Sequence, residues 1–248
     1  MGDLRHGRID VHSHLLPGID DGCKTVEESI ACARELVANG YTHAFCTPHI
    51  WSTYKGVSRV SVPRWCAALE RELAAAGVDL KLLPGGELNL YLGVEKLPPE
   101  DLVPLALGKY MLVDLWAAEL PPFFEPAIRW LHDMGLTVIL AHPERMRAVQ
   151  DQPDIVDYFS SLGVLLQGNL QCFSDKPGAP TRMCAERFLL EGKYFLLGSD
   201  SHNPQTMDIR MNGLARVIEL VGEEAVATLT QIHPARLAPD IFDQPRGQ

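Results

Sequence analysis

The chain has 248 residues, of which 46% are hydrophobic and 22% are charged, and its formal net charge is -10. This apolar content is sufficient for a full core and excludes a disordered chain. The acidic balance argues against nucleic acid and anionic membranes as partners, because both are usually bound through basic patches. No segment approaches the roughly 18 consecutive apolar residues of a membrane span, so we expect no membrane insertion.

The N-terminus and the cysteines both indicate a cytoplasmic protein. The opening Met-Gly-Asp-Leu-Arg-His contains no apolar signal region. Six cysteines occur without any Cys-x-x-Cys pair, which excludes a zinc knuckle and a thioredoxin-type motif. We therefore expect reduced thiols and a cytoplasmic location.

Short apolar runs rich in β-branched residues alternate with amphipathic segments along the chain. The predicted strands are 9–11, 44–46, 80–83, 110–115, 137–141, 164–167 and 195–197. The predicted helices are 27–39, 63–76, 122–134, 153–162, 181–191 and 212–221. The longest breaks are the loops 50–62 and 90–104, and we expect 234–248 to form a loosely docked tail. No linker divides the chain, so we predict a single domain over 1–248.

The repeated strand–helix–strand order predicts parallel strands joined by right-handed crossovers. Such strands form either a doubly wound sheet or a closed barrel. In a doubly wound sheet ligands gather at one switch point, whereas here a potential ligand follows nearly every predicted strand. We therefore predict an α/β fold, a distorted TIM-like (β/α) barrel of about seven strands.

Histidines and carboxylates at these strand ends form an ordered series. His12 and His14 are two residues apart, so in a strand they face the same side and can share one cation. Such a pair alone is weak evidence. The series continues with Asp21, His49, Glu87, Asp114, His142, Asp200 and His202. The other histidines, His6, His43, His132 and His233, do not fit the series and receive no metal role.

Divalent cations are the explanation that we favour for these carboxylates, with a hydrogen-bonded core network as the alternative. The carboxylates of Asp21, Glu87, Asp114 and Asp200 carry four negative charges, and about three divalent ions would supply six positive ones. The net charge of about plus two would attract an anion such as a phosphate ester. Arg145, close behind His142, could bind the phosphoryl oxygens. Its alternative role is a salt bridge to Glu144 or to another acidic residue.

The series resembles the polymerase and histidinol phosphatase (PHP) superfamily, on the motifs His12-x-His14, Thr-Pro-His49, Gly-Gly-Glu87, His142-Pro-Glu-Arg145 and Ser-Asp200-Ser-His202. Within it, the opening Ile-Asp-Val-His-Ser-His-Leu-Leu-Pro-Gly-Ile-Asp-Asp-Gly is similar to capsule-regulating tyrosine-protein phosphatases of the CpsB and YwqE type. The resemblance covers essentially the whole chain.

This resemblance implies a metal-dependent phosphoesterase with a three-metal site, usually manganese, with Fe, Zn, Co and Mg as alternatives. The implied substrate is the phosphotyrosine-bearing tail of a bacterial tyrosine kinase that governs exopolysaccharide synthesis, and the implied nucleophile is a metal-bridging hydroxide. The implied ligands are His12, His14, Glu87 and Asp200 for one metal, Glu87, Asp114 and His142 for a second, and Asp21, His49 and His202 for the third. Arg145 matches the catalytic arginine that engages the phosphate.

The chain departs from this pattern at two positions. Asp114 stands where these phosphatases usually have Glu, and its shorter arm could lengthen a metal bond or admit a water ligand. In the family a basic residue often stands a few positions after the final Asp-x-His. This chain has no basic residue directly after Asp200-Ser-His202, and Arg210 is the nearest substitute.

Other functions remain open on the sequence. A phosphatase for a small metabolite such as histidinol phosphate would use the same metals. A nuclease is disfavoured by the acidic composition. A metal-stabilised binding domain without catalysis is the alternative from another class, motivated by the change at Asp114.

Overall fold

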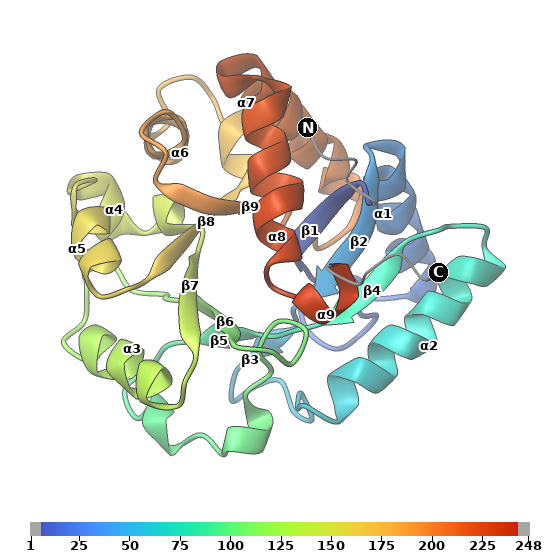
Figure 1. The fold of residues 1–248 in the computed structure, drawn as a ribbon, viewed down its shortest axis with the longest axis horizontal. Helices are drawn as coiled ribbons and strands as arrows, with labels where there is room; N and C mark the ends of the chain where they lie inside the picture. Colours follow the sequence, from blue (N-terminus) through green and yellow to red (C-terminus); the bar gives the residue numbers. More distant parts are fainter. Residues whose placement is uncertain (1–5, 243–248) are drawn as a thin grey trace.

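The computed structural model describes residues 6–242 and arranges them as parallel strands with helices around them (Figure 1). The strands are β1 (Arg8–Ser13), β2 (Tyr41–Cys46), β3 (His49–Ile50), β4 (Lys81–Pro84), β5 (Glu87–Asn89), β6 (Tyr110–Asp114), β7 (Thr137–Ala141), β8 (Leu165–Asn169) and β9 (Tyr194–Gly198). The helices are α1 (Val26–Ala38), α2 (Ser61–Ala75), α3 (Phe124–Asp133), α4 (Arg147–Asp151), α5 (Ile155–Ser161), α6 (Pro180–Leu190), α7 (Met207–Ala227), α8 (His233–Ala235) and α9 (Pro239–Phe242).

Two interrupted strands divide the barrel into two parallel sheets, ordered β1-β2-β4 and β3-β5-β6-β7-β8-β9. After β2 the chain passes through Pro48, which has no N–H to donate, and resumes as β3. After β4 it passes through Gly85 and Gly86, where an added Cβ would lie 2.7 Å from the side chain of Leu105 or Ile50. The seven predicted strands are confirmed, and β3 and β5 are additions too short to produce a sequence pattern.

The barrel closes between β1 and the segment that follows β9. Asp200 N donates to His12 O at 2.8 Å, and His14 N donates to Ser201 O at 2.9 Å. Ser13 and Ser201 also pair as an isolated parallel bridge. The predicted fold class, a distorted α/β barrel, is confirmed.

The predicted helices correspond to α1, α2, α3, α5, α6 and α7. In α1, Thr25 caps the first turn by accepting from Glu28 N at 3.3 Å, and Gly40 follows the helix with a φ of 82°. The main difference is α7, which we predicted only over 212–221. It continues past Gly222, whose φ of 79° places a kink inside the element.

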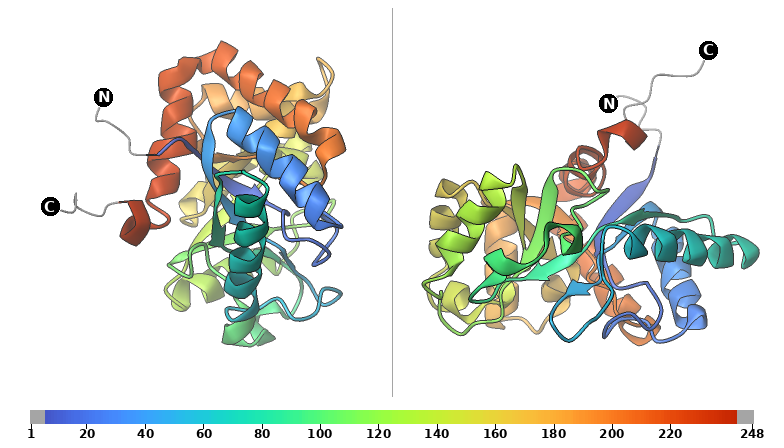
Figure 2. Two further views of the ribbon diagram at one scale, coloured as in Figure 1. Left: turned by 90° about the vertical axis from the view of Figure 1, so that its right-hand side faces the viewer. Right: turned by 90° about the horizontal axis from the view of Figure 1, so that it is seen from below.

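The apolar side chains form two clusters. The smaller cluster takes residues such as Val11, Phe45 and Leu112 from β1, β2, β4, β6, β7 and β9. Their strand neighbours, such as Val113, belong to the larger cluster together with the inner faces of the helices. One face of the strands therefore lines the barrel interior and the other packs against helices. The helices α1 and α2 cover one flank, and α3 to α5 cover the opposite flank (Figures 1 and 2).

The predicted tail is packed where the structure describes it. Leu237 is 2% exposed and Ala238 is 4% exposed, and both belong to the smaller cluster. His233 Nδ1 lies 2.8 Å from the carbonyl oxygen of Phe195, near the start of β9. This segment therefore packs at the amino ends of the strands instead of docking loosely. Residues 243–248 of the predicted tail lie outside the described residues.

The remaining sequence predictions concern the long loops, the thiols and membrane insertion. The loop 90–104 contains two short 3-10 turns, Val94–Lys96 and Pro99–Asp101. All six cysteines are free and buried. Within residues 6–242 no helix is long and apolar enough to cross a membrane.

Candidate metal centre

The predicted ligands lie together at the carboxyl ends of the strands, because parallel barrel strands all end at one mouth. They belong to β1 and the loop after it (His12, His14, Asp21), to β3 (His49), β5 (Glu87) and β6 (Asp114), and to the segments after β7 (His142) and β9 (Asp200, His202). Side-chain ligand atoms converge within 4.8 Å in three groups: His12, His14 and Asp200; His12, Glu87 and His142; and His14, Asp21, His49 and His202.

The first group surrounds a common point. His12 Nε2 and His14 Nε2 are 3.1 Å apart, and they lie 3.4 and 3.5 Å from Asp200 Oδ1. Glu87 Oε2 lies 3.3 and 3.4 Å from the same two nitrogens. Ligands about 2.1 Å from a tetrahedral ion are separated by about 3.4 Å, so these spacings suit one shared cation.

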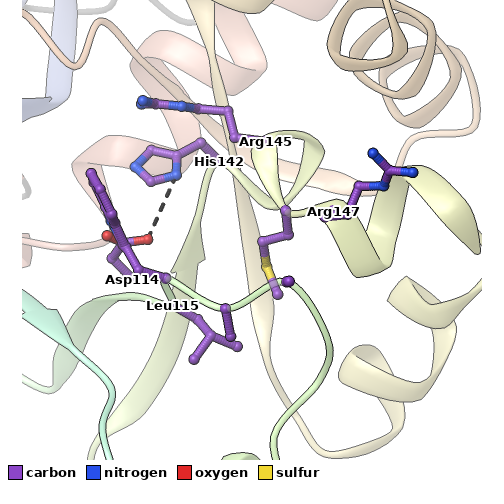
Figure 3. A pocket seen from close by; sticks show the side chains of 9 residues that line it. Asp114, Leu115, His142, Arg145 and Arg147 are labelled. Carbon is purple, nitrogen blue, oxygen red and sulfur yellow. Dashed lines mark ion pairs between the residues drawn. The ribbon is translucent and has the colours of Figure 1, made fainter.

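The second group uses the other oxygen of Glu87. Glu87 Oε1 lies 3.2 Å from His142 Nε2. Asp114 approaches the opposite side of the imidazole, with its Oδ1 3.9 Å from His142 Nδ1 (Figure 3). Asp114 is therefore the one predicted ligand that joins none of the three groups. It does line the cavity at the barrel mouth, together with Asp21, His49, Glu87, His142, Asp200 and His202.

The third group lies nearer the solvent. Asp21 Oδ1 lies 3.2 Å from His49 Nε2 and 3.6 Å from His202 Nε2. His14 is shared with the first group, so the two groups are contiguous. The three groups form one continuous polar cluster at the barrel mouth.

Several buried atoms of this cluster lack a hydrogen-bond partner among the described residues. Both carboxylate oxygens of Glu87 lie near imidazole nitrogens, the nearest being His49 Nδ1 at 2.9 Å, without well-formed hydrogen bonds, and Asp114 Oδ2 also lacks one. Buried carboxylate oxygens without partners are costly, and cations between them and the imidazoles would supply the missing interactions. Imidazole nitrogens with carboxylate oxygens are the donor set of Zn, Mn and Fe sites. The residues present therefore fit divalent metal ions.

The carboxylates create a negative field around the imidazoles. Burial opposes protonation of His142, yet Glu87 and Asp114 raise its pKa to about 9. At His49 burial is likewise outweighed, here by Asp21 and Glu87, and the pKa rises to about 9. Burial and the charge of Glu87 raise the pKa of Asp114 to about 6. This field favours positive charge, so metal binding would be coupled to proton release.

Two polar residues that we did not predict as part of the site orient its histidines. Asp20 Oδ2 lies 2.7 Å from His14 Nδ1, and Gln167 Oε1 lies 2.9 Å from His12 Nδ1. Each contact fixes the ring and leaves Nε2 directed at the first group. The sequence did carry a signal for Gln167, because an amide inside an apolar strand needs a partner.

The segment that carries Asp200 is held by three further residues that we had not assigned this role. Asn169 Nδ2 donates to Asp200 Oδ2 at 2.8 Å. Arg210 is buried, and its Nη2 donates to the carbonyl oxygen of Asp200 at 2.6 Å. Asp10 accepts a hydrogen bond from Ser199 N at 2.8 Å. Arg210 thus fixes the backbone at the mouth, in addition to lining the cavity.

Arg145 forms an ion pair with one carboxylate of the polar cluster, that of Asp200. Its Nη1 donates to Asp200 Oδ2 at 2.8 Å, while 45% of its side chain remains exposed. Glu144 does not pair with it, because the Glu144 carboxylate accepts from Asn169 N and from Tyr194 OH. The arginine therefore presents a partly exposed positive charge beside the carboxylates.

Two residues of the cluster have strained backbones. His142 has a φ of 35° and Asp200 has a φ of 51°, in the left-handed region that L residues avoid. Non-glycine residues are held in this region when the surrounding structure fixes them, and they concentrate at functional sites.

The four histidines without a predicted metal role lie outside the three groups. His132 contacts the carbonyl oxygens of Leu136 and Leu162 through its two ring nitrogens, both at 3.0 Å. His6 and His43 both contact the ring of Phe242, with ring centroids 4.7 and 4.8 Å apart.

A barrel of parallel strands with converging imidazoles and carboxylates at its mouth defines the class of metal-binding α/β barrels. Within that class, the chain belongs to the CpsB/CapC family of capsular polysaccharide synthesis, whose model matches residues 8–238.

Relatives and solved structures agree with this family. The tyrosine-protein phosphatase YwqE of Bacillus subtilis is 27% identical over 225 residues, which cover 90% of this chain and 89% of YwqE. The tyrosine-protein phosphatase CpsB of Streptococcus agalactiae is 26% identical over 220 residues, which cover 86% of this chain and 89% of CpsB.

A solved structure is similar over almost the whole fold. It comes from a study of YwqE from Bacillus subtilis and CpsB from Streptococcus pneumoniae, described there as unique metal-dependent tyrosine phosphatases. It matches with a TM-score of 0.83 and 26% identity, covering 92% of this chain and 94% of that one. A lactonase from Listeria monocytogenes, at a TM-score of 0.57 and 13% identity, shares the fold alone.

Proposed function

We propose that this chain removes phosphate from phosphotyrosine in proteins, with divalent metal ions, as part of capsular polysaccharide synthesis. The protein is a metal-dependent tyrosine phosphatase of the CpsB and YwqE type. The observation that carries this proposal is the convergence of ligand atoms in three clusters, each made of histidines and carboxylates, with Arg145 beside them. The chain that carries them is a member of the CpsB/CapC family.

The proposed ligands follow the three groups of converging atoms. His12, His14, Glu87 and Asp200 would hold one metal, and Glu87 with His142 would hold a second. Asp21, His49 and His202 would hold a third. Asp114 would complete the second set only after its side chain moved, because its Oδ1 lies 3.9 Å from His142 Nδ1, the ring nitrogen on the side away from Glu87.

Divalent ions bound in these sets would activate a water molecule and neutralise phosphoryl charge. The residues of the chain supply the positioning. Asp20 and Gln167 hold the rings of His14 and His12. Arg145 would bind phosphoryl oxygens through its planar guanidinium group. A phenolate, whose parent pKa is about 10, leaves more readily than a serine alkoxide, so cleavage needs no strong general acid.

The finer assignments extend the same proposal. We assign manganese as the metal, because mixed imidazole and carboxylate donors suit it. We assign the phosphorylated tail of a bacterial tyrosine kinase as the substrate, in keeping with the role of the family in capsular polysaccharide synthesis. We place the enzyme in the cytoplasm, where its six free thiols would stay reduced.

The test is a comparison of catalytic efficiency on three substrates with manganese present: a tyrosine-phosphorylated peptide, the matching phosphoserine peptide and histidinol phosphate. We expect the highest kcat/KM for the phosphotyrosine peptide. Preference for histidinol phosphate would replace the substrate and keep the metal site. Tight peptide binding without turnover on any substrate would instead support the non-catalytic binding domain.

A further inference from the structure

A second cavity opens beside the metal centre. Its volume is about 380 Å³, and the cavity lined by seven of the nine predicted metal ligands measures about 300 Å³. The two share Asp114, Trp116, His142 and Arg145 in their walls. A substrate whose phosphate lies at the ligands can therefore extend directly into the second cavity.

The rest of the second cavity is largely apolar. Leu115, Ala117, Ala118 and Met146 line it. Arg147 lies at its outer edge (Figure 3). The Arg147 Nε contacts the Asp151 carboxylate at 2.9 Å. An apolar substrate group would gain free energy by leaving water for this wall.

Trp116 stands where the two cavities meet and has an exposed face. Its side chain is 68% exposed, although indole is among the side chains that bury the most apolar area in proteins. It contacts Trp51 edge to face, with ring centroids 5.3 Å apart and an interplanar angle of 86°. Trp51 in turn stacks on His49, at 4.6 Å and 26°. Ring contacts thus connect the ligand His49 to the indole of Trp116, whose exposed surface can still contact a bound molecule.

We propose that Trp116 and the second cavity bind the phenyl ring of phosphotyrosine and so create a preference for aryl over alkyl phosphates. This inference rests on the proposed function and adds a binding site for the ring. Aromatic rings pair favourably in stacked or edge-to-face geometry, beyond the gain from area alone. A phosphoserine side chain has no ring to place there, so it would forgo this contact while keeping the contacts of its phosphate.

The direct test is binding, because it does not depend on turnover. Calorimetry on the manganese-loaded protein would compare phenylphosphonate with propylphosphonate in wild type, Trp116→Ala and Trp116→Phe. We expect wild type to bind phenylphosphonate about tenfold more tightly, Trp116→Ala to lose this difference, and Trp116→Phe to retain most of it. Equal affinities in wild type, or an undiminished difference in Trp116→Ala, would overturn the inference.

Turnover then separates this inference from the proposed function. Trp116→Ala should raise KM for a phosphotyrosine peptide several-fold more than KM for the matching phosphoserine peptide, and Trp116→Phe should restore most of the loss. The matched control is Leu190→Ala, because Leu190 is 63% exposed and ends α6, which leads into the amino end of β9. If wild type cleaves no phosphotyrosine but still prefers phenylphosphonate, the proposed function fails and the ring site stands. If wild type cleaves phosphotyrosine and Trp116→Ala has an unchanged KM, the ring site fails alone.

Discussion

Replacing Asp20 by Asn should weaken metal binding without removing a predicted ligand. Asp20 is 8% exposed and its carboxylate has three contacts: His14 Nδ1 at 2.7 Å, Gly22 N at 3.0 Å and His49 N at 3.0 Å. The amide keeps one acceptor oxygen, which can still serve Gly22 N. The contacts of the other oxygen with His14 and His49 are lost, and the negative charge is lost with them.

The size of the effect follows from what the carboxylate does to His14. Burial opposes protonation of His14, but Asp20 raises the pKa of the ring well above its ordinary value, which marks strong coupling. Loss of a carboxylate that orients a ligating histidine typically reduces metal affinity about 10- to 100-fold. This corresponds to about 1.4–2.8 kcal/mol.

The assay is a manganese titration of metal-free Asp20→Asn, followed by calorimetry and by phosphate release at each manganese concentration. We expect the half-saturating concentration to rise by the same factor, with activity recovering at saturating manganese. The control is Asp157→Asn, an exposed carboxylate on α5 that pairs with Lys193. Wild-type manganese affinity in Asp20→Asn would refute the reasoning, and so would activity that stays lost at full occupancy.

Three other predictions test separate parts of the account. Asp114→Glu should raise the manganese bound per chain in metal analysis, because the longer arm can carry the carboxylate past the Nδ1 side of His142, where Asp114 Oδ1 lies 3.9 Å away, toward Glu87 and His142 Nε2; an unchanged metal content would count against residue 114 as a ligand position. Arg145→Met should lower kcat/KM about 100-fold at unchanged metal content, and a mutant that instead loses metal would show that the arginine serves mainly to hold Asp200. Burial, with help from His6, lowers the pKa of His43 to about 4 from 6.5, so the folded protein loses stability as the pH falls from 6.5 toward 4. In chemical denaturation of metal-free protein, the free energy of unfolding of His43→Gln should therefore rise by about 1 kcal/mol relative to that of wild type when the pH is lowered from 7 to 5, after allowance for solvent screening. Parallel pH profiles of the two proteins would contradict this.

The barrel and the positions of the ligands were predictable because each depends on a local pattern. Apolar runs at regular intervals define the strands, and parallel strands bring their carboxyl ends to one mouth, so residues as distant as His12 and Asp200 meet there. The interruptions at Pro48 and Gly85 were not predictable as strand breaks, because β3 and β5 have only two and three residues.

The contacts that orient the site depend on tertiary packing and were harder to predict. Nothing local distinguishes Asp20, which orients His14, from Asp21, which lies beside His49 and His202. Gln167 reaches His12 across 155 positions of sequence. Arg145 was predicted as a phosphate ligand with Glu144 as one possible partner, and the structure pairs it with Asp200. Long-range pairings of this kind follow from the closure of the barrel and not from spacing along the chain.

The most direct test of the central claim is phosphate release from a tyrosine-phosphorylated peptide by the untreated protein, by protein stripped with a chelator, and by stripped protein resupplied with manganese. Metal-dependent catalysis requires turnover in the first sample, its loss in the second and its recovery in the third, with His142→Ala inactive throughout. Full activity after the metals have been removed would contradict it, because the buried carboxylates and imidazoles would then have no catalytic role for a cation.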